Sequence, residues 1–248
     1  MRTIKLLLLS LGLAAVACAM QSCLDDDNDH YYNIVMPNAL VTVKPAAGNT
    51  GFYLQLDDST TLKPVNMSQS PFGNRQVRAL VNYSTADQDP APYKQAVRIN
   101  WIDSILTKPL AKDLGDDNPA TYGNDPVEIV NDWVTIAEDG YLTLRVRTLM
   151  SGQVKHIVNL VATPTADNAY VVTFYQDAQG DVNGVPADAL VAFDLAGSLP
   201  DTGGKTVDLV LKWNSYSGAK QATFKYCSRK AGTAGISLRN LHYSKWVK

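Results

Sequence analysis

Short stretches in which apolar and polar residues alternate run through most of the chain, with Gly, Pro, Asn and Asp between them. A period of two is typical of half-buried β-strands, because successive side chains point to opposite faces of a sheet. The pattern predicts strands before residue 113 over 39–43, 52–56, 61–65, 77–83 and 97–101. It predicts further strands over 133–136, 141–149, 155–161, 170–175, 191–195, 206–213 and 220–226. The sequence therefore predicts an all-β protein.

The spacing of these strands predicts two domains. Residues 103–114 are the one helix candidate of the first half, but Pro109 in their middle limits them to a short turn followed by a strand. The short strands within 34–114 suit a small Greek-key barrel of the OB kind. Residues 115–126 are dense in turn formers and predict a linker. The strands within 127–226 then favour a β-sandwich.

The amino-terminal residues predict a secretory signal over 1–22. Two basic residues precede an apolar run, 6–19, which is shorter than the roughly 20 residues that a membrane-spanning helix needs. Cleavage after Ser22 would leave Cys23 at the new amino terminus as the lipidated residue. Cys18 is the alternative, but it lies inside the apolar run, so we favour Cys23.

Charge is distributed unevenly along the chain. Residues 23–226 hold 24 acidic and 15 basic side chains, a net charge of −9, which disfavours a nucleic-acid partner. Within them, the acidic segment 23–33 predicts a flexible tether, because like charges repel. The tail 227–248 has five basic residues and no acidic one; a solvated tail is favoured over contact with anionic lipid. With Cys23 lipidated, Cys227 has no disulfide partner, so stability must come from core burial.

Few residues have the spacing of a catalytic or metal site. His156 is the only histidine in a predicted strand, since His30 lies in the tether and His242 in the tail. We expect it to be structural, because no Gly-x-Ser-x-Gly elbow accompanies it and no second histidine or cysteine completes a zinc-binding pair. No cofactor is expected, and with no catalytic pattern the chain is predicted not to be an enzyme.

Calcium is the metal that is hardest to dismiss. Asp177, Asp181 and Asn183 place oxygen ligands near two glycines, and calcium takes six to eight oxygens. The spacing departs from the EF-hand pattern, with neither its central glycine nor its closing glutamate. A polar hairpin loop is therefore favoured over a metal site.

Aromatic residues are the candidates for glycan binding, because sugars stack on exposed rings. The tryptophans in predicted strands are expected to be core residues: Trp101, Trp133 and Trp213. The tyrosines in polar stretches are expected to be exposed: Tyr31, Tyr32 and Tyr122. A pair of carboxylates for glycoside hydrolysis cannot be selected among 24 acidic residues.

Several segments, taken in order, resemble the NigD-like lipoproteins of Bacteroidota. They are Cys23-Leu24-Asp25-Asp26-Asp27, Arg78-Ala79-Leu80-Val81-Asn82-Tyr83, Ile102-Asp103-Ser104-Ile105-Leu106-Thr107-Lys108, Gly123-Asn124-Asp125-Pro126 and Lys155-His156-Ile157-Val158-Asn159-Leu160-Val161. The resemblance implies an OB-like domain followed by a β-sandwich, with no established enzymatic activity. It also implies display on the outer face of the outer membrane. Two short motifs resemble O-glycosylation acceptors of this bacterial group, at Ser59 and Ser104, and Ser59 in a predicted turn is favoured.

The function that these features favour is a non-catalytic, lipid-anchored envelope protein that presents a binding surface to a protein or a glycan. A bacteriocin-associated accessory or immunity lipoprotein is the alternative that the family resemblance implies. A glycan-degrading enzyme is the least favoured reading, since no catalytic constellation supports it.

Overall fold

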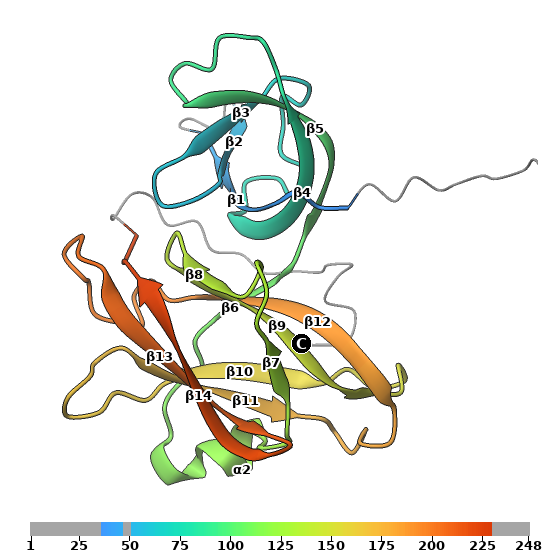
Figure 1. The fold of residues 1–248 in the computed structure, drawn as a ribbon, viewed down its shortest axis with the longest axis vertical. Helices are drawn as coiled ribbons and strands as arrows, with labels where there is room; N and C mark the ends of the chain where they lie inside the picture. The colour runs from blue at the N-terminus through green and yellow to red at the C-terminus, as the bar shows by residue number, and fades with distance from the viewer. Residues whose placement is uncertain (1–35, 47–50, 230–248) are drawn as a thin grey trace, which may run out of the picture. The chain divides into compact units, whose positions relative to one another are not determined.

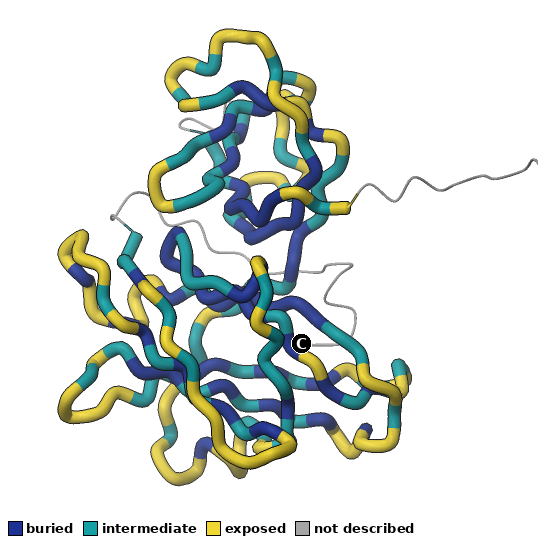
Figure 2. Tube along the Cα trace, viewed as in Figure 1, coloured by how far each residue is buried: buried dark blue, intermediate teal, exposed yellow. Residues whose placement is uncertain are grey.

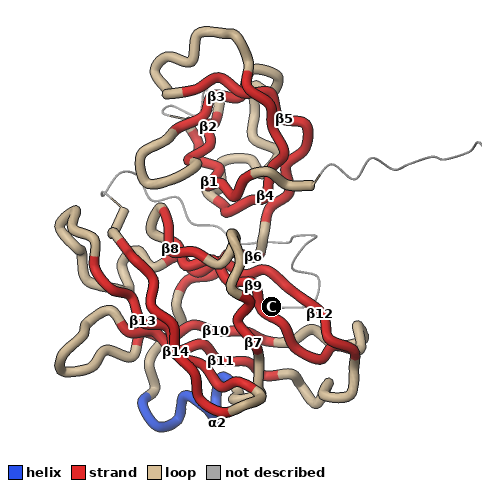
Figure 3. Tube along the Cα trace, in the orientation of Figure 1, coloured by secondary structure: helices blue, strands red, loops and turns tan. Residues whose placement is uncertain are grey.

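The computed structural model describes residues 36–46 and 51–229, and its first five strands close into a barrel (Figures 1 and 3). The strand bounds are β1 Ala39–Pro45, β2 Phe52–Gln55, β3 Thr61–Pro64, β4 Val77–Thr85 and β5 Gln95–Ser104. Around the barrel the order is β1-β2-β3-β5-β4, with antiparallel pairs except between β3 and β5. The predicted strands and the predicted barrel are confirmed.

The barrel is filled by the inward side chains of this alternation. Its core includes Val41, Val43, Leu54, Leu62, Ala79, Val81 and Val97, all fully buried. Strand β1 is buried on both faces because Leu40 points away from the barrel core. It packs into a second apolar cluster with Leu80 and Ile105 and with Leu190 and Ala192 from the following domain.

The remaining strands form two sheets that pack face to face. One sheet has the order β10-β11-β13-β14, from Ile157–Ala162, Val171–Asp177, Val207–Ser215 and Gly218–Tyr226. The other has the order β6-β12-β9-β7, from Leu106–Pro109, Val185–Asp194, Tyr141–Met150 and Glu128–Val130, with β8 Ile136–Glu138 also paired to β9. Apolar side chains from both sheets meet in one core, and Figure 2 shows buried strand interiors with exposed loops. The predicted β-sandwich is confirmed.

The structure differs from the sequence expectation at the start of the sandwich. Residues up to 114 were expected in the first domain, but β6 pairs in parallel with β12 of the sandwich. No helix forms over 103–114, as expected, and Pro109 is the last residue of β6. The expected linker 115–126 contains a 3₁₀ turn, Gly115–Asp117, and a short helix, α2 Asn118–Tyr122. No helix among the described residues is both long and apolar enough to span a bilayer.

A buried arginine ties the barrel to the sandwich. Arg78 of β4 is fully buried, and its guanidinium donates to Thr42 Oγ1 at 3.0 Å and to Glu138 Oε2 at 3.3 Å. The ring of Tyr141 lies 5.9 Å from the Arg78 guanidinium carbon and 4.5 Å from that of Arg229. Because a buried charge is costly unless it is paired, this arginine is an anchor of the fold rather than a solvent-facing group.

Candidate functional site

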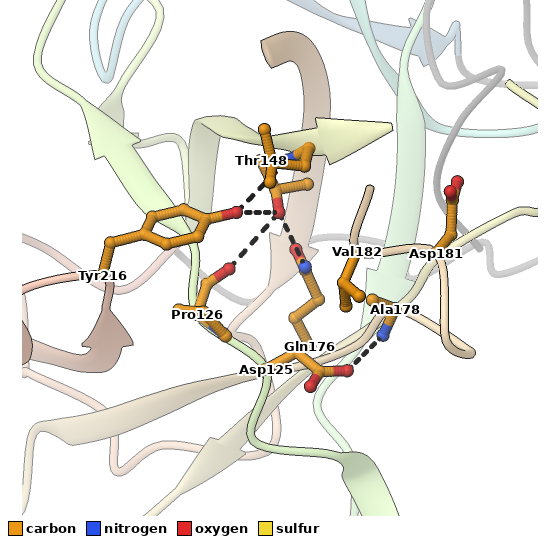
Figure 4. A pocket seen from close by; sticks show the side chains of 9 residues that line it. Asp125, Pro126, Thr148, Gln176, Ala178, Asp181, Val182 and Tyr216 are labelled. Atoms are coloured by element: carbon orange, nitrogen blue, oxygen red, sulfur yellow. Dashed lines mark hydrogen bonds between the residues drawn. The ribbon is translucent and has the colours of Figure 1, made fainter. Parts of the chain in front are cut away.

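A small pocket lies at one end of the sandwich, where four separate segments meet (Figure 4). Its volume is about 60 Å³, enough for a few water molecules or the end of one side chain. The residues that line it are Asp125, Pro126, Thr148, Leu149, Gln176, Ala178, Asp181, Val182 and Tyr216. We call this set the Tyr216 pocket.

The hydrogen bonds at the centre of the Tyr216 pocket have only one consistent direction. Thr148 Oγ1 lies 3.3 Å from the Pro126 carbonyl oxygen, which can only accept, so the single hydroxyl proton of Thr148 points there. Thr148 must then accept from Tyr216 Oη at 2.9 Å and from Gln176 Nε2 at 3.1 Å. Tyr216 Oη in turn accepts the Leu149 N–H at 3.2 Å.

The side-chain oxygen of Gln176 receives no hydrogen bond from the described part of the chain. Its side chain is 1% exposed, and no described residue bonds to its Oε1 atom. A buried acceptor without a donor costs free energy, so each such atom needs an explanation. The Gln176 Oε1 atom is enclosed, so it is an unsatisfied acceptor behind the pocket wall.

The wall of the pocket is built by the segment Gly123-Asn124-Asp125-Pro126. Gly123 has φ +84°, and a Cβ atom there would lie 2.4 Å from the Gln176 carbonyl oxygen, so only glycine permits this approach. Asp125 then donates its N–H to that carbonyl at 2.9 Å and accepts the Ala178 N–H on Oδ2 at 2.7 Å. Asn124 accepts from Asn214 Nδ2 at 2.7 Å. The motif therefore positions the pocket wall.

Asp181 forms the opposite side of the pocket. Its Oδ2 atom accepts the Ser151 N–H at 2.9 Å and lies 3.4 Å from Nε2 of His156. The Ser151 N–H, which bonds to the charged form, holds the pKa of the Asp181 carboxyl below its ordinary value. His156 is fully buried, as expected of a structural residue, and its Nδ1 atom has no partner among the described residues.

Two exposed side chains with apolar surface, Val182 and Tyr216, line the pocket, and a third, Val185, lies three residues after Val182 at the start of β12. Tyr216 is 52% exposed, Val182 50% and Val185 70%. Val185 begins β12, and its neighbour Pro186 pairs in register with Leu149 of the pocket wall. We call Val182, Val185 and Tyr216 the rim patch. Such exposed apolar groups around a polar centre are typical of interaction surfaces.

The predicted calcium candidates do not converge on one point. Asp177 accepts from Gln179 within its own turn, Asn183 is exposed, and only Asp181 lines the pocket. Among the described residues, no group of three or more His, Cys, Asp or Glu side chains could hold a metal ion. The loop is also not a hairpin, because it crosses from β11 in one sheet to β12 in the other.

The aromatic candidates are distributed differently from the expectation. Trp213 is a core residue, whereas Trp101 is half-buried and Trp133, in the turn before β8, is 52% exposed. Trp133 was expected in a strand, but only three residues, starting at Ile136, pair there. Tyr122 is half-buried rather than exposed, because its hydroxyl donates to the Lys112 carbonyl at 2.8 Å.

The two serines predicted as O-glycosylation sites differ in accessibility. Ser59 is exposed in the turn between β2 and β3, where its N–H and its hydroxyl both donate to Asp57. Ser104 is 1% exposed at the end of β5, so the folded chain does not present it to a glycosyltransferase.

Several predicted residues lie outside the described ranges. They are Cys18, Ser22, Cys23, His30, Tyr31, Tyr32 and His242, together with the tether and most of the tail. The signal cleavage and lipidation predictions therefore stay predictions.

Sequence analysis did not identify Thr148, Gln176 or Tyr216. Thr148 and Gln176 lie in strands, and the alternation along a strand indicates only which side chains face the core of the domain, not which residues they contact. Tyr216 did have a usable signal, since an aromatic residue stands in the turn Asn214-Ser215-Tyr216-Ser217-Gly218 among residues that favour turns.

Fold and site together define a class: a two-domain all-β protein with an OB-like barrel, a β-sandwich, and a small pocket with exposed apolar residues at the sandwich end. Residues 40–105 match the model of the NigD-like N-terminal OB domain, and residues 109–226 match that of the NigD-like C-terminal beta sandwich domain. The chain belongs to the NigD-like family. No curated protein matches it.

Solved structures with the same fold come from related bacteria. A Parabacteroides distasonis protein described as toxin-related is 37% identical, with a TM-score of 0.64, over 77% of this chain and 92% of that chain. A NigD-like immunity protein from Bacteroides caccae is 22% identical, with a TM-score of 0.55, over 76% of this chain and 96% of that one. A protein from Bacteroides fragilis described as a lipoprotein is 11% identical, with a TM-score of 0.51, over 78% and 98%. The last two show the fold alone.

Proposed function

We propose that the chain is a non-catalytic, lipid-anchored protein of the cell envelope that binds a partner protein through the rim patch. The observation that carries this proposal is the rim patch itself, three residues that are each at least half exposed although valine and tyrosine side chains gain from burial. Two of the three, Val182 and Tyr216, also line the Tyr216 pocket. The surface therefore combines apolar area with a small pocket that has a hydrogen-bonded network behind its wall.

A protein partner is favoured over a glycan by the chemistry of the rim. Sugars stack on aromatic faces and bond to many polar groups, whereas Val182 and Val185 offer only aliphatic surface. Aromatic and aliphatic side chains around a polar centre are typical of protein–protein interfaces. A glycan would engage Tyr216 and leave the two valines without a role.

The pocket does not have the arrangement that nucleophilic catalysis requires. A hydroxyl nucleophile needs a base that accepts its proton, and the Thr148 proton is held by a backbone carbonyl instead. His156 contacts Asp181 and is fully buried, so it does not face the pocket centre as a general base. These contacts support a binding role.

The anchor is proposed at Cys23, which would hold the folded domains on the outer membrane, facing outward. The support is the signal-like sequence over 1–22, the acidic segment after Cys23 and the lipoprotein description of the Bacteroides fragilis neighbour. Deletion of the acidic segment should leave lipidation intact and alter surface exposure, measured by protease accessibility in whole cells.

A second candidate function is immunity to a bacteriocin. It is favoured by two neighbours, one described as a NigD-like immunity protein and the other as toxin-related. In this role the bound partner would be the toxin or its exporter. A gene deletion that leaves bacteriocin sensitivity and bacteriocin export unchanged would exclude it.

Site-directed photocrosslinking in living cells tests the proposed function. A photoreactive residue at Val185 should form a defined crosslink, and the crosslink should disappear when Tyr216→Ala is added. The matched control is Thr223, an exposed position on β14 that does not line the pocket. Equal crosslinking from both positions, or crosslinks only to glycan, would refute a protein partner at the rim patch.

A further inference from the structure

The sequence contains one Asn-Gly pair, Asn183-Gly184, in the loop that joins β11 to β12. The pair stands between Val182 and Val185 of the rim patch, which are 50% and 70% exposed. Asn183 is itself exposed, and its side-chain amide forms no hydrogen bond with another described residue. This amide is therefore free to rotate and open to water.

The backbone nitrogen of Gly184 is accessible as well. No described residue accepts a hydrogen bond from its N–H, because the register of β12 with β9 begins only at the next residue, Val185. Glycine has no Cβ atom that would shield this nitrogen. The fold also requires glycine here, since a Cβ atom at residue 184 would overlap the backbone of Met150 and Ser151. The loop therefore joins an unbonded asparagine amide to an unshielded backbone nitrogen.

These two groups can react with each other. The Gly184 nitrogen, after losing its proton, attacks the side-chain carbonyl carbon of Asn183, and the new C–N bond closes a five-membered imide. The bond from that carbon to the side-chain nitrogen breaks, and the nitrogen takes up a proton and leaves as ammonia. Water then opens the imide at either carbonyl and produces aspartate or isoaspartate. In sum, one amide and one water become a carboxylic acid and ammonia.

We propose that Asn183 is a self-modification site whose conversion weakens partner binding at the rim patch as the protein ages. Either product places a negative charge between Val182 and Val185, and isoaspartate also lengthens the backbone by one carbon ahead of Val185. Charged groups are depleted from the centres of protein interfaces, because burying an unpaired charge is costly. The inference rests on the proposed partner-binding role of the rim patch and names a chemical change that regulates that surface.

The first test follows the full chain in detergent over time by peptide mass spectrometry, with a separation that resolves aspartate from isoaspartate. We expect Asn183 to convert spontaneously and about tenfold faster at pH 8 than at pH 7, because the deprotonated nitrogen is the nucleophile. Asn131 is the internal control: it is also exposed, but the next residue, Asp132, has a side chain that hinders attack. An Asn183 that stays an amide in the folded chain, or equal conversion at Asn131, would overturn the proposal.

The second test measures how much partner protein each variant retains on purification from native membranes. Asn183→Asp imitates the charged product and should retain about tenfold less partner, whereas Asn131→Asp adds the same charge outside the rim patch and should retain the wild-type amount. Asn183→Gln keeps an amide but cannot close the five-membered ring, so its partner should remain after ageing. Full retention by Asn183→Asp together with loss in Val185→Asp would overturn this inference alone. Conversion at Asn183 with no loss in Val185→Asp would instead reject the proposed function.

Discussion

Replacement of Arg78 by methionine tests whether this residue is the anchor between barrel and sandwich. The variant keeps most of the side-chain volume and removes the guanidinium. Glu138 Oε2, 3.3 Å from Nη2, then loses its counter-charge, although the Glu138 side chain is only 17% exposed. Arg78→Met therefore leaves a poorly solvated carboxylate rather than an empty space.

The expected loss follows from the geometry. Unit charges 3.3 Å apart attract by about 5 kcal/mol at an effective dielectric constant of about 20. Part of this gain offsets the desolvation of both groups, and removal of one member of a buried pair costs about 3–5 kcal/mol. We expect Arg78→Met to lower the free energy of unfolding by that amount. The double variant with Glu138→Gln should recover about 2 kcal/mol, because the orphaned charge is gone.

The pH dependence has a definite sign. Burial raises the pKa of Glu138, and Arg78 opposes the rise, so the pKa climbs further without the arginine. A carboxyl with a raised pKa destabilises the fold as pH rises from its unfolded to its folded pKa. The loss caused by Arg78→Met should therefore be smaller near pH 5 than near pH 8. The Glu138→Gln background should remove this difference.

The assay is urea unfolding of wild type, both single variants and the double variant at the two pH values, followed by circular dichroism. An Arg78→Met loss below about 1 kcal/mol would refute the reasoning. So would a double variant that is no more stable than Arg78→Met, since the loss would then come from packing alone.

Three further predictions concern the lipid anchor, the pocket wall and a half-buried lysine. Cys23→Ala should abolish palmitate labelling; retained label would contradict lipidation at Cys23. Gly123→Ala should lower the free energy of unfolding by at least about 2 kcal/mol more than Gly73→Ala, which has φ +63° but open space; equal losses in urea unfolding would contradict this. Burial lowers the pKa of Lys108 to about 8, so wild-type stability should rise with pH above that value; Lys108→Met should lack the rise, and an identical pH profile would contradict it.

The alternation of apolar and polar residues predicted the strands, because the pattern of a strand depends only on residues that are neighbours in the sequence. The barrel strands and most long strands of the sandwich were found in this way, within a few residues of their observed bounds, but β12, predicted over 191–195, begins at Val185. Strand β7 was not predicted, because three residues are too few to display a period of two, and β6 was expected only as a strand of unstated bounds within 103–114. The sheet to which β6 belongs could not be read either, since its partner β12 begins 79 residues after Leu106.

The pocket could not be predicted, because its residues come from distant segments. Asp125, Thr148, Gln176 and Tyr216 meet only after both sheets have formed. The local pattern also placed Trp133 within a strand, because pattern alone does not distinguish an aromatic residue just before a strand from one inside it. The sequence does contain the Gly123-Asn124-Asp125-Pro126 segment, but only the structure shows why residue 123 is glycine: a Cβ atom there would clash with the Gln176 carbonyl oxygen.

The most direct test of the central claim is comparative purification from native membranes with quantitative mass spectrometry. Wild type, Val185→Asp and the control Thr223→Asp are extracted under the same conditions. The account predicts a partner protein that is retained by wild type and by Thr223→Asp and is lost with Val185→Asp. The same partners at the same abundance in all three samples would contradict a binding role for the rim patch.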